Sequence, residues 1–236
     1  MSSLLLLSNS TSDAGYLTHA LDWIADALGD ARRLAFVPYA AVTFGYGDYT
    51  ARVQHALASL GVEVTGVHTA DDPAEAVRQS DAVLVGGGNT FHLLREAYAT
   101  GVMGAISERV RGGAPYVGWS AGANLACPTV RTTNDMPVVE PPTLDALGLV
   151  PVQINPHYTD AHPDGHRGET RAERLAEFVA ANPGVPVVGL PEGTAAWITD
   201  GTASLLGDGT ARVFDERTPS GRAATVGEAE RLLEGR

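Results

Sequence analysis

Short apolar segments alternate with amphipathic helical patterns along most of the chain. Between the apolar segments, leucine, isoleucine and valine recur at helical spacing, for example at Leu17, Leu21, Ile24 and Leu28. Strands without in/out alternation that are separated by helices are typical of a parallel sheet covered on both faces. We predict such strands at Leu4–Leu7, Leu34–Pro38, Val62–Val67, Ala82–Val85, Tyr116–Trp119, Val152–Asn155 and Val187–Leu190.

The last part of the chain has a different pattern. Three segments separated by glycines predict an antiparallel meander, and the polar tail from Asp215 predicts one more helix around Glu228–Leu233. Residues 1–236 contain no evident linker or repeat, so we expect one α/β domain. The predicted fold is a single doubly wound, mostly parallel sheet with helices on both faces and a small antiparallel C-terminal extension. The three segments of the meander are Ala195–Thr199, Ala203–Leu206 and Ala211–Phe214.

The composition limits the partners and the compartment. The 236 residues are 44% hydrophobic, and 28 acidic against 16 basic side chains give a net charge of −12. Such a surface repels phosphates and anionic lipids, so we expect neither nucleic acid nor membranes as partners. The apolar run at Leu4–Leu7 is too short for a signal peptide, no run approaches a membrane span, and the lone Cys127 excludes an intrachain disulfide. We therefore expect a cytoplasmic protein in which Cys127 is a buried core residue. The oligomeric state stays open, a homo-oligomer included.

One motif carries candidate catalytic chemistry. The predicted strand Tyr116–Trp119 runs into Gly118-Trp119-Ser120-Ala121-Gly122 and then into a helix. G-x-S-x-G alone is a weak signal, but on a strand-to-helix turn it exposes the serine hydroxyl and directs the N–H of Ala121 at an oxyanion. The alternative is that Ser120 caps the helix and that Gly122 only permits close packing. We favour Ser120 as a nucleophile.

Polar residues follow several of the predicted strands, and they are candidates for the same site. Ligands of such sheets bind beyond the carboxyl ends of the strands, so we expect these ends to converge on one rim. His157, held next to Pro156, suits a general base for Ser120. The acid that orients this base is either Glu192, at the end of a strand, or Asp135, in a polar loop after Ser120. The residues alone do not choose between the two.

The glycine run after Val85 has two interpretations. It lacks the spacing of a dinucleotide-binding loop and the lysine of a P-loop. We interpret it as an oxyanion-hole loop, in which the N–H of Gly88 acts with that of Ala121. Asn89, which follows directly, is a predicted substrate-binding residue.

Histidines and aspartates after the strand at 152–155 could suggest a metal site. Their spacing matches no common set of ligands, and Pro163 and Gly165 exclude a helix there. We therefore expect neither a metal ion nor another cofactor. The residues in question are His157, Asp160, His162, Asp164 and His166.

A family resemblance is carried by seven segments: LLLLSNS at 4–10, VGGGNTF at 85–91, GWSAGANLACPT at 118–129, RTTNDMP at 131–137, INPH at 154–157, GHRGETR at 165–171 and GLPEG at 189–193. Together they resemble the peptidase E family of α-aspartyl dipeptidases, serine hydrolases with the class I glutamine amidotransferase-like fold. The resemblance implies Ser120 as nucleophile and His157 as base, and both Asp135 and Glu192 fall on positions proposed for the third member. It also implies dipeptides that begin with aspartate as substrates, with blocked or longer peptides mostly left alone.

Two segments depart from the family's pattern. We expect the loop Phe44-Gly45-Tyr46-Gly47 to line the pocket and to alter the preference for the residue after aspartate. The second departure, His162, touches none of the motifs.

The side-chain carboxylate of an aspartyl substrate needs a positively charged partner in the site, because the protein as a whole carries a net charge of −12. We predict that Arg171 binds its side-chain carboxylate, since a guanidinium matches a carboxylate bidentately. The alternative for Arg171 is a surface ion pair with Glu169 or Glu173.

Three other functions stay open beside the α-aspartyl dipeptidase. The first is a cyanophycinase-like exopeptidase of the same fold that acts on β-linked aspartyl peptides. A glutamine amidotransferase is weaker, because its nucleophile would be cysteine and Ser120 stands at this turn. The third is a non-catalytic metabolite-binding module that uses Gly86–Gly88.

Overall fold

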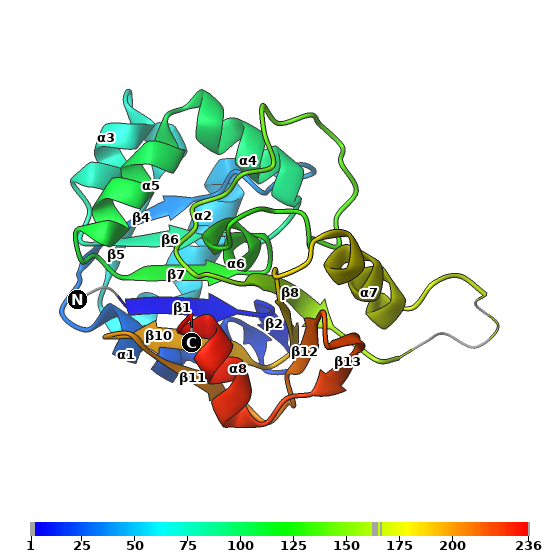
Figure 1. Ribbon diagram of the computed structural model, residues 1–236. Helices are drawn as coiled ribbons and strands as arrows, with labels where there is room; N and C mark the ends of the chain where they lie inside the picture. Colours follow the sequence, from blue (N-terminus) through cyan, green and yellow to red (C-terminus); the bar gives the residue numbers. More distant parts are fainter. Residues whose placement is uncertain (1–2, 162–164, 166, 236) are drawn as a thin grey trace.

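The protein is built around two sheets (Figure 1). The structure is a computed structural model that describes residues 3–161, 165 and 167–235. The larger, central sheet has seven strands, of which the five in the middle and at one edge run parallel. The last two strands add antiparallel at the other edge. From that edge the order is β11 (Thr202–Leu206), β10 (Ala195–Thr199), β1 (Ser3–Leu7), β7 (Tyr116–Trp119), β6 (Ala82–Val85), β4 (Arg33–Val37) and β5 (Glu63–Gly66).

Helices bury both faces of the central sheet, as the uninterrupted apolar strands predict. In β1, Leu4 and Leu6 belong to one hydrophobic cluster, whereas Leu5 and Leu7 belong to another. Successive side chains of a strand point to opposite faces, so a strand buried on both sides has no polar positions. The first cluster includes residues of α3 (Pro73–Arg78), α4 (Thr90–Ala99), α5 (Val102–Arg111) and α6 (Ala121–Ala126), and the second includes residues of α1 (Leu21–Leu28) and α2 (Tyr46–Ala56).

The second sheet differs in detail from the predicted arrangement. The strands predicted at 152–155 and 187–190 pair with each other in parallel, but they do so outside the central sheet. The place beside β1 that a further parallel strand would take is occupied by antiparallel β10. The predicted meander is divided accordingly, since β10 and β11 extend the central sheet while β12 joins the second one. The second sheet has the order β13 (Thr218–Ala223), β12 (Arg212–Asp215), β9 (Val187–Pro191) and β8 (Gln153–Tyr158).

A shared hydrophobic core connects these two sheets. Strand β1 points toward the second sheet (Figure 1), and Ile154, Val188 and Val213 of that sheet join the cluster that contains Leu4 and Leu6. The α/β class with a mostly parallel central sheet is therefore confirmed, with one core shared by both sheets. The other elements are α7 (Arg171–Ala181), which covers the second sheet, α8 (Val226–Leu233), the short strands β2 (Thr11–Ser12) and β3 (Gly15–Tyr16), and the 3-10 helices η1 (Thr18–Ala20), η2 (Ala58–Leu60) and η3 (Val67–Thr69).

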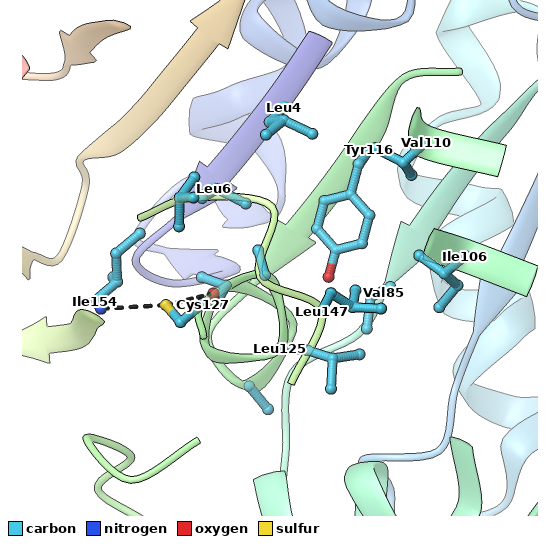
Figure 2. Packing of buried hydrophobic residues seen from close by; sticks show 14 of the residues in the cluster. Leu4, Leu6, Val85, Ile106, Val110, Tyr116, Leu125, Cys127, Leu147 and Ile154 are labelled. Carbon is cyan, nitrogen blue, oxygen red and sulfur yellow. Dashed lines mark hydrogen bonds between the residues drawn. The ribbon is translucent and has the colours of Figure 1, made fainter. Parts of the chain in front are cut away.

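The cysteine lies inside the shared core, as predicted. Cys127 is fully buried (Figure 2), and its Sγ accepts the N–H of Ile154 at 3.2 Å. Burial raises the pKa of this thiol to about 12, which disfavours the nucleophilic thiolate. Cys127 is therefore a packing residue.

Among the described residues, the helices are all too short or too polar to cross a membrane.

Candidate active site

Ser120 occupies a strained turn between β7 and α6. Its φ of 54° and ψ of −111° lie where residues other than glycine are rare. Although Ser120 stands at the N-cap position of α6, its side chain makes no capping hydrogen bond. The Oγ atom instead lies 2.9 Å from Nε2 of His157. The alternative role of Ser120 as a helix-capping side chain is thus wrong.

The two glycines that flank the serine permit this turn sterically. A Cβ atom on Gly122 would lie 2.2 Å from the carbonyl oxygen of Val85, and one on Gly118 would lie 2.5 Å from the carbonyl oxygen of Gly122. Both contacts are far below van der Waals separation and involve backbone atoms. Helix α6 can therefore begin directly against the end of β6 only with glycine at these positions.

His157 lies in β8 at an irregularity in the pairing with β9. Its φ is 53°, again a conformation that side chains disfavour. The buried Ser8 holds it there, because the Ser8 hydroxyl accepts the His157 N–H at 2.8 Å and donates to the carbonyl of Leu190 at 2.8 Å. Sequence reasoning missed this role of Ser8, and its only signal is the SNS segment at the end of the first strand.

Glu192 is the carboxylate that reaches the imidazole. Its Oε1 lies 2.6 Å from Nδ1 of His157, while its side chain is 64% exposed. Asn9, next to Ser8, accepts the N–H of Gly193 through its Oδ1 at 2.8 Å and so fixes the turn that carries Glu192. Ser120, His157 and Glu192 form one continuous line of hydrogen bonds.

The structure brings Asp135 to a different partner. Its Oδ2 accepts from the N–H and the hydroxyl of Thr90, at 2.8 and 2.6 Å, and from the hydroxyl of Thr133 at 3.1 Å. These bonds tie the loop that carries Asp135 to the N-terminus of α4, where a carboxylate is favoured. Of the two acids left open by the sequence, Glu192 is the one in contact with His157.

Asn89 also has a local structural role. Its Oδ1 caps α4 by accepting the N–H of His92 at 3.0 Å, and its Nδ2 donates to the carbonyl of Met136 at 2.8 Å. Both polar ends of this side chain are therefore engaged. Substrate binding by Asn89 stays a prediction.

The glycine loop after β6 packs directly against the serine. A Cβ atom on Gly87 would lie 3.0 Å from Cβ of Ser120, and one on Gly88, which has a φ of 136°, would lie 2.3 Å from the carbonyl oxygen of Ala40. The Tyr49 hydroxyl donates to the carbonyl oxygen of Gly87 at 2.9 Å. Because a trans peptide points its N–H away from its C=O, this bond fixes the direction of the Gly88 N–H.

Tyr49 is in turn held by Trp119, the last residue of β7, which directly precedes Ser120. The indole N–H of Trp119 donates to the Tyr49 hydroxyl at 3.0 Å, and burial raises the pKa of this phenol, which keeps it a donor. Sequence reasoning missed Tyr49, since a tyrosine on a helix face carries no catalytic signal.

Arg171 lies in a second cavity of about 190 Å³, which is also lined by Asp135 and Asn155 but not by Ser120, His157 or Glu192. Its Nη1 lies 3.3 Å from Oδ1 of Asn155, and it forms no ion pair with any residue in the described ranges. Glu169 lies 3.8 Å from Arg174 instead. Burial, together with the nearby charge of Arg174, lowers the pKa of Arg171. The surface ion pair considered for Arg171 is therefore not formed.

The histidine-rich segment gives no support for a metal site. Asp160 forms an ion pair with Arg212 at 3.0 Å, while His162, Asp164 and His166 lie outside the described residues. Within the described part of the chain, no group of three His, Cys, Asp or Glu side chains is suited to hold a metal ion.

A serine on a strand-to-helix turn, bonded to a histidine and through it to a carboxylate, defines the class of serine hydrolases. The model of the family described as Peptidase family S51 matches residues 4–206, and the chain belongs to this family. Curated relatives include Peptidase E of Escherichia coli O6:K15:H31, 53% identical over 197 residues, and Peptidase E of Citrobacter koseri, 54% identical over 196 residues. Each alignment covers 83% of this chain and 85% of the relative.

Solved structures agree on the fold. A peptidase from an acI-B1 Actinobacterium superposes with a TM-score of 0.69 at 17% identity, covering 97% of this chain and 96% of that one. A structure from Listeria monocytogenes EGD-e, described as a peptidase E protein, superposes with a TM-score of 0.66 at 24% identity, covering 89% of this chain and 100% of that one.

The family and the curated relatives define the enzyme class. The protein is a serine-type peptidase, and the predicted dipeptidase activity agrees with the name of its relatives.

Proposed function

We propose that the protein hydrolyses dipeptides with an N-terminal aspartate through an acyl-enzyme on Ser120. One observation carries the proposal: Ser120 Oγ, the His157 imidazole and the Glu192 carboxylate are joined by contacts of 2.9 and 2.6 Å. A serine hydroxyl is a weak nucleophile until a base takes its proton, and this line supplies that base. The name Peptidase E, borne by relatives more than 50% identical, supports the substrate class.

In the first half of the reaction, Ser120 Oγ attacks the carbonyl carbon of the aspartyl residue and His157 Nε2 accepts the hydroxyl proton. Glu192 accepts the Nδ1–H of His157, which keeps Nε2 free to accept and stabilises the imidazolium that forms. The imidazolium then gives its proton to the nitrogen of the leaving residue, and the C–N bond breaks. The aspartyl group remains as an ester on Ser120.

In the second half, water attacks this ester while His157 takes its proton. Aspartate leaves, and the proton returns to Ser120 Oγ. In both halves a negative charge develops on the carbonyl oxygen, and we assign the N–H groups of Gly88 and Ala121 to it. Ala121 begins α6, where the first N–H groups of a helix have no acceptor within the helix.

Arg171 is our candidate for the cation that binds the aspartyl side chain. It is half-buried and without a carboxylate partner among the described residues, in a protein with a net charge of −12. A partly desolvated charge without an opposite charge is costly, and a substrate carboxylate offsets that cost. This favours acidic substrates over neutral ones of the same size.

We expect Arg171→Met to lower kcat/KM for Asp-Leu by roughly 30-fold or more, because losing one partner of a desolvated charge pair costs about 2–5 kcal/mol. Hydrolysis of Ala-Leu should change much less. Arg78→Met is the control, since this arginine lies on α3, is 40% exposed and pairs with Glu75 and Glu108, so its loss should affect both substrates little. Equal losses on Asp-Leu and Ala-Leu for Arg171→Met would assign it a supporting role only.

A panel of Asp-Leu, Glu-Leu, Asn-Leu and β-linked Asp-Leu tests the proposed substrate class. We expect the fastest hydrolysis with Asp-Leu and a large loss with Asn-Leu, which has the same shape without the charge. Faster hydrolysis of β-linked Asp-Leu would instead establish a β-aspartyl exopeptidase. A fluorophosphonate should label Ser120, and an unlabelled protein without hydrolysis would be a binding module.

Other expectations complete the proposal. The core shared by both sheets supports a single domain over residues 1–236. A cytoplasmic location, the absence of nucleic-acid partners and the oligomeric state stay predictions.

A further inference from the structure

An arginine that the proposed mechanism does not use lies in the same cavity as the nucleophile. Arg52, on α2, lines a cavity of about 310 Å³ together with Ser120 and His157. It is the only lysine or arginine among the described residues that line this cavity, and they include no carboxylate. Arg52 thus supplies a positive charge to the cavity that Ser120 also lines.

Two aromatic rings hold this guanidinium. Its Cζ lies 5.7 Å from the ring centre of Tyr16 and 5.4 Å from that of Phe44, within the range of cation–π interactions. Contact with ring faces positions the planar group without using its N–H donors. In the described part of the chain Arg52 makes no hydrogen bond and no ion pair, although acidic residues outnumber basic ones by 28 to 16. Its donors are therefore not engaged by the described residues, and they are available to a ligand in the cavity that Arg52 lines.

The chemistry of the ligand follows from the cavity. A planar guanidinium with free donors binds a carboxylate or another oxyanion bidentately. In a dipeptide substrate the leaving residue carries a free α-carboxylate, about 4 Å from the scissile bond, which is one residue along the chain. In a longer or amidated peptide the same position holds a neutral amide. An arginine at this place therefore distinguishes a dipeptide from a longer chain.

We propose that Arg52 binds the α-carboxylate of the leaving residue and so selects dipeptides over longer or amidated peptides. The proposal rests on the hydrolysis of Asp-X by Ser120 and adds the group that reads the length of the substrate. Phe44 is 38% exposed at the same cavity and offers an apolar surface to the side chain of the leaving residue. The predicted contribution of the Phe44–Gly47 segment to the pocket is confirmed for Phe44, while Gly45 precedes α2 and Tyr46 and Gly47 begin it.

The test compares Asp-Leu with its C-terminal amide, Asp-Leu-NH₂, in the wild type and in Arg52→Met. Methionine keeps an apolar stem against the two rings and removes the charge. We expect kcat/KM for Asp-Leu to fall by about 10-fold to 100-fold, as for the loss of a hydrogen-bonded charge, with the larger part in KM. Hydrolysis of Asp-Leu-NH₂ should stay within about twofold of the wild type, so the preference for the free acid collapses.

Three further variants separate charge from packing. Arg52→Lys keeps the charge without the fork and should retain a preference intermediate between the wild type and Arg52→Met. Arg52→Glu should reverse the preference, because a like charge then faces the substrate carboxylate. Arg33→Met removes one positive charge at the opposite end of the central sheet, where β4 begins, and should leave the preference unchanged.

An Arg52→Met enzyme that keeps the wild-type ratio of kcat/KM for Asp-Leu and Asp-Leu-NH₂ would overturn the proposal, whether both values stay unchanged or fall equally. These results differ from a failure of the proposed function. If the wild type does not hydrolyse Asp-Leu at all, the proposed reaction is wrong; if it does and the ratio is insensitive to Arg52, only the assignment of Arg52 is wrong.

Discussion

The two halves of the candidate site are held in place by different means. Ser120 is positioned by backbone packing, since Gly118 and Gly122 let α6 begin against β6 with no room for a Cβ atom. His157 and Glu192 are positioned by side chains of Ser8 and Asn9, which belong to a distant part of the sequence. Both Ser120 and His157 adopt a positive φ, so each half stores local strain that its surroundings stabilise.

This difference has a practical consequence. Steric support by glycine is all-or-none. A Cβ atom added to Gly122 would lie 2.2 Å from the carbonyl oxygen of Val85, and a backbone carbonyl cannot move aside as a flexible side chain can. Support by hydrogen bonds is graded, since each bond contributes about 1 kcal/mol and water or a neighbour can replace part of it. We therefore expect substitutions on the serine side to affect folding and those on the histidine side to affect turnover.

Among the substitutions that compare the two halves of the site, we expect the largest loss of kcat at Glu192. Glu192→Gln should lower kcat by at least about 10²-fold and by as much as about 10⁴-fold, the cost of replacing a triad acid with its amide. Asp135→Asn should lower kcat less than about 10-fold and should mainly destabilise the start of α4, where its bonds to Thr90 lie. Steady-state kinetics with Asp-Leu decides between them, and the opposite order would make Asp135 the orienting acid.

The next effect is on stability. Gly122→Ala should destabilise the protein by about 3 kcal/mol or more, because the new methyl group overlaps the Val85 carbonyl in a central strand. Gly104→Ala is the matched control: it lies within α5 with nothing within 4 Å of the added Cβ, so we expect a gain of roughly 0.5–1 kcal/mol. Thermal or urea unfolding measures both. Equal stability of Gly122→Ala and the wild type would contradict steric support at the serine turn.

The smallest effect is expected at Ser8. Ser8→Ala leaves the N–H of His157 without its acceptor, at a cost of about 1–3 kcal/mol, and kcat should fall about 10-fold with KM nearly unchanged, as expected when a catalytic group is displaced. Ser80→Ala is the control, since Ser80 is also buried and its hydroxyl donates to the carbonyl of Val77 far from the site. It should lose stability without losing turnover. The same kcat for both variants would show that Ser8 does not position His157.

The parts of the structure that follow from local pattern were predictable. Strands such as β1 and β6 are apolar at every position because both faces are buried, and that pattern is visible in the sequence. Strand β13 was not predicted, since Thr218–Ala223 contains proline and glycine and has no alternation. The separate sheet formed by β8 and β9 was also missed, because the antiparallel pairing of β10 with β1 is a long-range choice that no local pattern encodes.

The same distinction applies to the site. Ser120 was predicted because its chemistry depends on immediate neighbours, and His157 because it comes shortly after the apolar segment from which a strand was predicted at 152–155. The choice between Asp135 and Glu192 depends on a distance between segments, which only the fold sets. Tyr49 and Ser8 were missed because their contacts, to Gly87 and to His157, join residues 38 and 149 positions apart.

The central claim is that Ser120 forms the acyl-enzyme in the hydrolysis of Asp-X dipeptides. Its most direct test is the rate of Asp-Leu hydrolysis by Ser120→Ala, with unfolding curves to show that the variant is folded. We predict a loss of at least about 10³-fold in kcat with stability close to that of the wild type, because alanine keeps the Cβ atom and the removed hydroxyl makes no capping hydrogen bond. Turnover by folded Ser120→Ala at the wild-type rate would contradict the account.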